Sequence, residues 1–213
     1  VAHVEAGLRS FDRTMPEEKN RVLTDHISDL LLTPSRDADT NLINEGVSSD
    51  MVAFVGNVMI DTLVRLLPTA NRRWPEVSKR FTGIRKGEYA VVTLHRPSNV
   101  DRAGNLREIL SDLTFLAESM PVIFPVHPRT RRRLAEIDDY EVGPIVLVEP
   151  LGYLEFLALQ TNARLVVTDS GGVQEETAFL GVPCITVREN TERPVTISHG
   201  TNSLAPPSRL RHV

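Results

Sequence analysis

Between residues 89 and 187, short apolar runs alternate with stretches whose apolar residues recur at helical spacing. The runs have strand length, which favours buried strands at 89–94, 121–126, 145–148, 164–168 and 182–187. The stretches between them predict helices at 105–119, 153–160 and 172–180. Strands that alternate with helices indicate βαβ units around a parallel sheet, so this part of the chain is restricted to an α/β fold.

The first residues carry a looser pattern. A helix is predicted at 17–30, directly after Pro16, because proline is favoured at a helix start. A second helix is predicted at 35–45 with Ser35 as its N-cap. Short strands are predicted at 30–33 and 51–55.

We place a domain boundary after Gly56-Asn57, which divides the chain into 1–57 and 58–213. Because domains usually have roughly 100–150 residues, 1–57 is expected to be the C-terminal remainder of a first Rossmann-like domain. The interval 67–86 contains two prolines and many charges. It is expected to be a helix end followed by a surface loop.

Charge and cysteine content narrow the classes of protein. The formal net charge of -4 gives no reason to expect nucleic acid as a partner. No apolar run reaches the roughly 20 residues of a membrane span, and no signal peptide is visible, so no membrane contact is expected. The single cysteine, Cys184, fits a reducing cytoplasm. Its apolar neighbours favour a buried thiol over a nucleophile.

The sharpest local signal is the segment 165–176, in which a strand leads through Asp-Ser-Gly-Gly into a helix. Gly171 and Gly172 allow a tight turn and close approach of a ligand, and the helix start offers free N–H groups to a phosphate. Ser170 adds a hydroxyl donor, and Glu176 could accept hydrogen bonds from ribose hydroxyls. The alternative is a plain strand–helix turn with Ser170 as its N-cap.

Two histidines follow predicted strands directly. His95 comes after the strand 89–94, and His127 comes after the strand 121–126. Ligands bind at the carboxyl ends of parallel strands in open α/β sheets, which favours a functional role over a structural one for this pair. No His-x-x-x-His pattern or cysteine cluster joins them, so no metal site is predicted.

Carboxylates form a third signal near the start of the chain. Glu5 stands two residues before a glycine, and Glu17 and Glu18 stand at a predicted helix start. Two carboxylates that converge on a cleft can be tuned apart in pKa to serve as acid and base. Glutamate is also common at helix N-termini for electrostatic reasons, and the sequence alone leaves both interpretations open.

These segments together resemble the successive motifs of the non-hydrolysing UDP-N-acetylglucosamine 2-epimerases. The motifs appear in family order between residues 3 and 202: His3-Val-Glu-Ala-Gly-Leu-Arg9, Pro16-Glu-Glu-x-Asn-Arg21, Val92-Thr-Leu-His-Arg96, Pro125-Val-His127, Asp169-Ser-Gly-Gly-Val-Gln-Glu-Glu176 and Thr191-Glu-Arg-Pro194. The resemblance implies an α/β fold with two Rossmann-like domains of the glycosyltransferase-B type, the first incomplete in this chain. One departure is Ser98, where the family motif usually carries a glutamate.

The resemblance also implies a role for each matching residue. Glu5 and Glu17 correspond to the glutamates of proton transfer and substrate binding, and His95 to an active-site histidine near the diphosphate. The substrate-binding set is then His127, Phe156 against uracil, Ser170, Gly171 and Gly172 at the diphosphate, Glu176 at ribose, and Arg193. From helical spacing alone, Phe156 would be assigned to the core.

The implied activity interconverts UDP-N-acetylglucosamine and UDP-N-acetylmannosamine by elimination and re-addition of UDP, with no cofactor and no metal. The full-length parent is expected to be a cytoplasmic homodimer. This chain is expected to lack the family's N-terminal part and C-terminal closing segment, and to be inactive alone. The alternatives are a UDP-sugar-dependent glycosyltransferase and a non-catalytic UDP-sugar-binding remnant.

Overall fold

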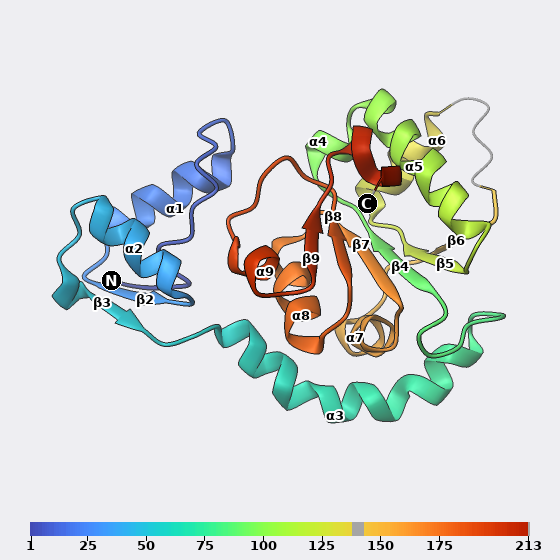
Figure 1. Cartoon of the computed structure of the whole chain (residues 1–213), viewed down its shortest axis with the longest axis horizontal. Coiled ribbons are helices and arrows are strands. Elements are labelled where there is room, and N and C mark those ends of the chain that lie inside the picture. The colour runs from blue at the N-terminus through green and yellow to red at the C-terminus, as the bar shows by residue number, and fades with distance from the viewer. Residues whose placement is uncertain (138–142, 213) are drawn as a thin grey trace.

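A computed structural model describes residues 1–137 and 143–212 of the chain, and contains two parallel sheets (Figure 1). The smaller sheet has the order β1-β2-β3, and the larger has the order β6-β5-β4-β7-β8-β9. Every neighbouring pair of strands in both sheets is parallel. We refer below to the first part, residues 1–57, and the second part, residues 58–212.

The first part contains β1 (Ala2–Val4), α1 (Pro16–His26), β2 (Leu30–Thr33), α2 (Arg36–Asn44), a 3₁₀ turn (Ser49–Met51) and β3 (Val52–Phe54). Its buried apolar cluster is small and consists of Ala6, Leu31 and Leu42. Gly7 lies where the turn after β1 crosses α2. A Cβ at this position would lie 2.4 Å from the carbonyl oxygen of Ala38, and its φ is +80°, so only glycine fits.

Two predictions for the first part need correction. The helix predicted at 17–30 ends at His26, because the chain must turn before Leu30 to pair β2 with Ala2 of β1. Ser35 does occupy the N-cap position of α2, but its side chain makes no capping hydrogen bond. Within the described residues, the Ser35 hydroxyl is buried without a partner.

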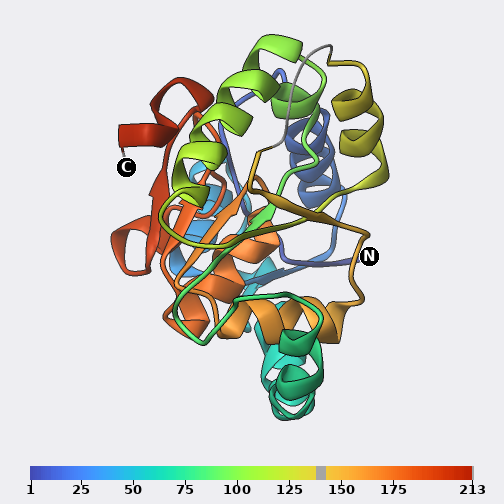
Figure 2. The same ribbon diagram turned by 90° about the vertical axis from the view of Figure 1, so that its right-hand side faces the viewer.

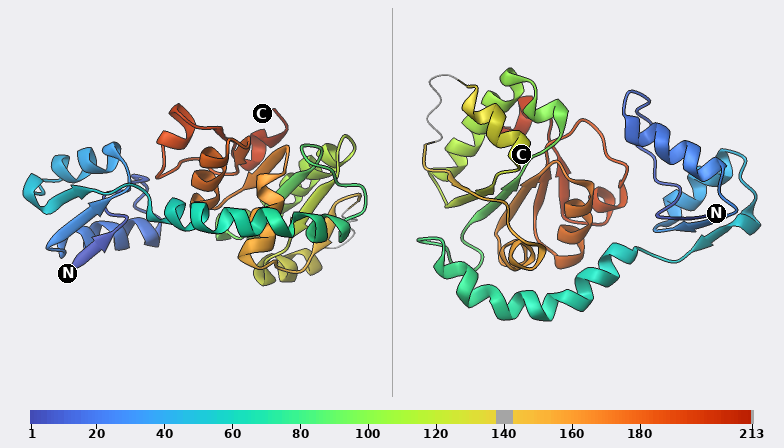
Figure 3. Two further views of the ribbon diagram at one scale, coloured as in Figure 1. Left: turned by 90° about the horizontal axis from the view of Figure 1, so that it is seen from below. Right: turned by 180° about the vertical axis from the view of Figure 1, so that it is seen from behind.

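The long helix α3 (Val58–Lys79) connects the two parts and packs against α7 along the second part (Figures 1, 2 and 3). The side chain of Asn57 caps it by accepting from the N–H of Met59 at 2.9 Å. The loop expected at 67–86 is therefore wrong for residues 67–79, and Pro68 and Pro75 lie inside the helix. Tertiary packing offsets the cost of the prolines, because Leu63, Ala70 and Val77 are all buried on one helix face.

The second part contains strands that match the predicted runs: β4 (Ala90–Thr93), β5 (Val122–Pro125), β6 (Val146–Val148), β7 (Leu165–Thr168) and β8 (Cys184–Thr186), followed by β9 (Asn202–Leu204). Its further helices are α4 (Pro97–Val100), α5 (Ala103–Ala117), α6 (Pro128–Ala135), α7 (Tyr153–Thr161), α8 (Gly171–Leu180), α9 (Val195–Ser198) and a 3₁₀ helix (Pro207–His212). The alternation of strands and helices thus produces the predicted parallel α/β sheet.

The six-stranded sheet is covered on both faces, which explains its unbroken apolar runs. Val92 points into a core shared with Leu106 and Leu110 of α5. The neighbouring Val91 points the opposite way, into a core shared with Leu63 of α3 and Leu157 of α7. Because successive strand residues face opposite sides, both must be apolar here.

Two residues outside the proposed site are packed within the second part, and for Cys184 this confirms the prediction of a buried thiol. Trp74 of α3 is a packing residue, stacked on Tyr89 with ring centroids 5.8 Å apart and planes 10° apart. The thiol of Cys184 is free and buried, and burial raises its pKa to about 11. A thiol with so high a pKa is almost wholly protonated near neutrality, which argues against a nucleophile.

Candidate functional site

The order of the large sheet determines where a ligand can bind. The chain moves outward from β4 through β5 to β6, and then returns to the other side of β4 with β7, β8 and β9. The connections after β4 and β7 therefore diverge and leave a crevice at the carboxyl ends of these two adjacent strands. His95 follows β4 and Asp169-Ser170 follows β7, so the topology brings the histidine and the glycine-rich turn together.

The glycine-rich turn lies against a charged pair. Ser170 is the N-cap of α8, and within the described residues its side chain makes no capping hydrogen bond. A Cβ on Gly171 would lie 2.5 Å from an Arg193 guanidinium nitrogen and 2.7 Å from a Glu192 carboxylate oxygen. Glycine at 171 is therefore needed for Arg193 to approach the start of α8 this closely.

His95 lies at the entrance of the crevice and contacts Asp169. Its side chain is 44% exposed, and its Nδ1 lies 2.9 Å from Oδ1 of the fully buried Asp169. Burial alone would raise the pKa of the Asp169 carboxyl, but the hydrogen bond and charge of His95, with the N–H of Arg96, hold it below its ordinary value. His127 is exposed at the start of α6, and its ring centroid lies 6.2 Å from that of His95.

Arg193 connects the two parts of the molecule. Its guanidinium lies 3.0 Å from Glu5 of the first part, 2.7 Å from Glu175 and 2.6 Å from Glu192. Burial alone would lower the pKa of Arg193, but the carboxylates of Glu175, Glu192 and Glu5 raise it. Glu5 itself has φ +71°, a conformation uncommon for a residue with a side chain, where β1 ends.

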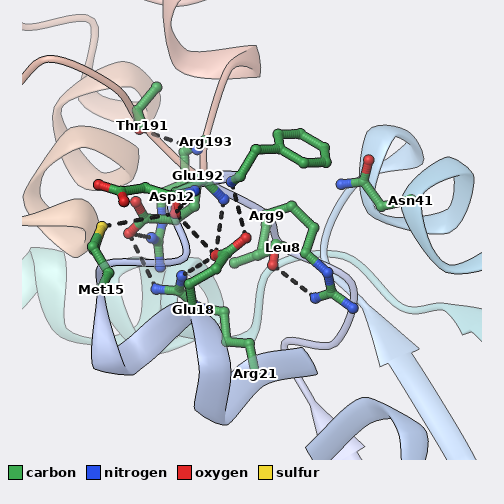
Figure 4. A network of polar contacts seen from close by, with 12 residues as sticks. Leu8, Arg9, Asp12, Met15, Glu18, Arg21, Asn41, Thr191, Glu192 and Arg193 are labelled. Carbon is green, nitrogen blue, oxygen red and sulfur yellow. Dashed lines mark hydrogen bonds and ion pairs between the residues drawn. The ribbon is translucent and has the colours of Figure 1, made fainter. Parts of the chain in front are cut away.

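Glu192 is the centre of this network. It is buried, and besides Arg193 it pairs with Arg188 at 2.8 Å and with Arg21 of α1 at 3.4 Å. Burial would raise the pKa of Glu192, but the hydrogen bond and charge of Arg188 outweigh it and lower that pKa to about 2. Figure 4 shows Glu192 and Arg193 extending toward Glu18 and Arg21 of the first part.

The two glutamates at the start of α1 have different surroundings. Glu18 is buried and accepts from the N–H of Ser10 at 3.0 Å and of Phe11 at 2.9 Å, so it shapes the preceding loop. Glu17 is exposed. Burial lowers the pKa of Arg96 across the crevice, and the negative charge of Glu17 opposes this shift only weakly. Of the two, only Glu17 has a carboxylate free to meet a ligand.

Glu176 and Phe156 lie at the side of the crevice formed by α7 and α8. Glu176 accepts from the hydroxyl of Tyr153 at 2.9 Å, while burial raises its pKa. Phe156 is half-buried and packs against the core between the sheet, α3 and α7. Its position thus fits the core assignment made from spacing, and its exposed portion leaves room for contact with a ligand.

An open groove separates the two parts beside this network. It is lined from the first part by Pro34, Ser35 and Phe54, and from the second by Glu175, Pro194 and His199, among others. Glu175, which lines this groove, also pairs with Arg193 of the charged network. Residues from both parts of the chain therefore line one groove beside the network.

Several residues of the site were not singled out from the sequence. Asp169, Arg21, Arg96 and Glu192 fall within the quoted motifs, but no role was given to them, and Arg188 lies outside the motifs. The sequence feature that could have identified them is a charged side chain next to an apolar or turn-forming segment. Arg188, directly after the apolar run 182–187, is an example. Among residues 1–137 and 143–212, no group of His, Cys, Asp or Glu is arranged to hold a metal ion.

The large sheet with its switch point, and the smaller parallel sheet facing it across the groove, define an α/β protein with two Rossmann-like domains of the glycosyltransferase-B type. Within the described chain, no helix has the length and apolar character needed to cross a membrane. Proteins with different activities share this fold class, so the family has to be identified from the amino-acid sequence.

The family described as UDP-N-acetylglucosamine 2-epimerase matches residues 1–211, and the chain belongs to this family. It is 45% identical over 212 residues to a UDP-N-acetylglucosamine 2-epimerase of Methanococcus maripaludis, covering 96% of this chain and 58% of that protein. It is 39% identical over 213 residues to the UDP-2,3-diacetamido-2,3-dideoxy-D-glucuronate 2-epimerase of Pseudomonas aeruginosa, covering 98% of this chain and 57% of that protein.

A solved structure agrees with the fold. The crystal structure of the Methanocaldococcus jannaschii UDP-GlcNAc 2-epimerase in complex with UDP-GlcNAc and UDP superposes with a TM-score of 0.88 at 44% identity. The match covers 100% of this chain and 60% of that one. The chain thus spans 57–60% of the length of these three relatives.

Proposed function

We propose that this chain is part of an enzyme that interconverts UDP-N-acetylglucosamine and UDP-N-acetylmannosamine. The observation that carries the proposal is the Arg193 junction, where the Arg193 guanidinium lies 3.0 Å from the Glu5 carboxylate of the first part and directly against Gly171 of the glycine-rich turn. A carboxylate beside a leaving diphosphate is the arrangement that elimination across carbon 2 and carbon 1 of the sugar requires. Membership of the epimerase family supports the same reaction.

The nucleotide half of the site follows from the second part. Ser170, Gly171 and Gly172 at the N-terminus of α8 are proposed to hold the diphosphate with their N–H groups and the serine hydroxyl. Glu176 would accept from the ribose hydroxyls, and Phe156 would pack on uracil. These assignments are supported by the position of the turn directly after β7, at the switch point of the sheet, and by the contact between α7 and α8.

The chemical half of the site uses charges from both parts. Glu5 and Glu17 are proposed to remove and return the proton at carbon 2, since the weak carbon acid needs aligned bases. His95, His127 and Arg193 are proposed to stabilise the negative charge that the diphosphate gains as it departs. The intermediate would be 2-acetamidoglucal held beside UDP, and the space between the two parts would shelter it from water.

The domain boundary, the oligomeric state and the cellular location are also proposals. We infer a boundary at residues 57/58, supported by the change of sheet and by Asn57 capping α3. A homodimer of the whole protein and a cytoplasmic location, the latter consistent with the free buried Cys184, remain proposals.

A second substrate is a candidate because of the relative from Pseudomonas aeruginosa at 39% identity, whose name specifies a diacetamido glucuronate sugar. Both sugars carry an acetamido group at carbon 2, so the same elimination applies. Competition of the two UDP-sugars for the binding site separates the candidates, and the higher identity to UDP-N-acetylglucosamine epimerases favours UDP-N-acetylglucosamine.

The nucleotide site is tested by calorimetric titration of the chain with UDP, beside a Ser170→Ala/Glu176→Ala double variant. Saturable binding that is lost in the double variant is expected. A Ser49→Ala/Glu118→Ala variant, altered at exposed positions of the 3₁₀ turn in the first part and at the end of α5, serves as the control and should bind as the parent does. Absence of binding by a folded chain would contradict the assignment.

The reaction is tested with UDP-N-acetylglucosamine in D₂O, on the whole protein of which this chain is proposed to be part and on the chain itself. Deuterium at carbon 2 of the recovered sugar marks proton exchange, and Glu5→Gln and Glu17→Gln are expected to abolish it. Sugar transfer to an acceptor without deuterium at carbon 2 would favour the glycosyltransferase. Binding of UDP with no exchange would mean that these 213 residues hold the nucleotide without completing the reaction.

A further inference from the structure

The buried carboxylate of Asp169 is surrounded by hydrogen-bond donors. Its Oδ2 accepts from the N–H of Arg96 at 2.9 Å, from the side-chain amide of Asn99 at 3.1 Å and from the N–H of His95 at 3.1 Å. Its Oδ1 accepts from the same His95 N–H at 3.1 Å and lies 2.9 Å from the ring Nδ1 of His95. A carboxylate has no proton to give, so this ring nitrogen must carry the proton that joins them.

The partner of the imidazole is therefore Asp169 and not the residue at position 98. Ser98 is exposed on α4, and its carbonyl accepts from the side chain of Asn105 at 3.0 Å. In the described part of the chain, the other ring nitrogen of His95, Nε2, has no hydrogen-bond partner. It is the nitrogen available to a ligand in the crevice.

We propose that Asp169 is a positioning residue that fixes His95 in the tautomer with the proton on Nδ1 and leaves Nε2 for the substrate. The same carboxylate stabilises the imidazolium that forms when Nε2 takes a proton. The tautomer stands on the geometry alone. Its use, to hold or move a proton at the oxygen of the departing diphosphate, rests on the proposed function.

A merely structural role for Asp169 also has support, because three of its donors tie the loop after β4 to the end of β7. That role predicts a loss of stability on substitution but says nothing about the ring proton of His95. The decisive readout is therefore the protonation pattern of the imidazole.

The test uses Asp169→Asn in the full chain labelled with ¹⁵N-histidine. The amide carbonyl must take the place of Oδ2, where three donors converge, so the NH₂ group faces Nδ1 of His95 and forces it to accept. The ring proton of His95 then moves to Nε2, so the variant has the opposite tautomer to the wild type. Correlation spectra of the ring nitrogens, recorded above the pH at which the imidazole titrates and assigned with His95→Gln, are expected to show this reversal.

The wild-type spectrum is decisive even if the variant does not fold, because a proton found on Nε2 in the wild type would overturn the proposal. An unchanged tautomer in folded Asp169→Asn would also overturn it. The control is Asp101→Asn, which removes a carboxylate that pairs with Arg129 and Arg133 but does not contact His95. Its His95 spectrum should match the wild type.

UDP titration of the same proteins separates this inference from the proposed function. Asp169→Asn is expected to weaken UDP binding by an amount on the order of tenfold, since the imidazolium loses its charge-assisted partner. Unchanged affinity in the folded variant would overturn the role of the pair in binding. No UDP binding by the wild type, with the tautomer as proposed, would overturn the proposed function and leave the tautomer standing.

Discussion

In the first part of the molecule the buried apolar cluster consists of Ala6, Leu31 and Leu42, whereas each face of the six-stranded sheet carries a much larger apolar core. The first part instead buries charge. Arg9 and Asp25 are almost wholly buried and lie 2.7 Å apart. The same kind of parallel strand arrangement thus buries charged pairs beside a small apolar cluster in one part, and mainly apolar side chains in the other.

The difference predicts how the free energy of unfolding of each part responds to substitutions of buried residues. Apolar cores lose stability in proportion to the volume removed and can relax around a cavity. Removing one partner of a buried ion pair costs at least as much, because the other charge stays buried with less compensation and has no cavity-like way to relax. The junction at Glu192 and Arg193 belongs to the second case, because both residues are charged and buried. It also connects the two parts, since Glu192 pairs with Arg21 of the first part.

The largest expected effect is in the first part. Asp25→Ala leaves Arg9 with Glu45 as its remaining acidic partner, but takes an acceptor from Arg9, from the Gly7 N–H and from His3. Because three donors lose a buried acceptor at once, the change should cost about 3–5 kcal/mol. Hydrogen exchange of the β1 and β2 amides measures the loss locally, together with urea unfolding. The matched control is Asp29→Ala, an exposed carboxylate that pairs with the N-terminus, which should change little. A loss below about 1 kcal/mol would break the comparison.

A somewhat smaller effect is expected in the core of the second part. Leu110→Ala, at a fully buried position of α5, should lower the free energy of unfolding by about 3 kcal/mol through lost transfer energy and a cavity. Leu23→Ala, the same change at a position of α1 that is 63% exposed, is the control and should cost little beyond helix propensity. Equal losses for the two variants would show that burial does not distinguish these sites.

The smallest expected effect is a pH dependence at the junction. The folded pKa of Glu192, about 2, lies below its unfolded value of 4.5, so its contribution is complete above about 4.5 and is lost as the pH falls toward about 2. Burial raises the pKa of Glu175, so its contribution has the opposite sense and changes above pH 4.5, outside the window of Glu192. Unfolding measured at a series of pH values should therefore show a modest loss in this window, and Glu192→Gln should flatten it. An unaltered slope in the variant would assign the acid sensitivity to other carboxylates.

The sequence anticipated the second part better than the first for a physical reason. In the second part a strand such as β4 is apolar on both faces, and the alternation with helices leaves few topologies. In the first part, α1 and β2 adjoin without a clear break, because Leu30 continues the apolar pattern of the preceding helix. The helix α3 was missed between 67 and 79 since its prolines oppose a helix locally and only packing against α7 offsets them.

The sequence by itself determined the parallel α/β fold, the glycine-rich turn at 170–172 and the identity of the chemical groups, because these depend on patterns only a few residues long. Only the tertiary structure decided that β7 lies beside β4, which places Asp169 against His95, and that Glu5 meets Arg193 although 188 positions separate them. Strand order and contacts between the two parts depend on the free energy of the whole packed chain, and no local pattern encodes them.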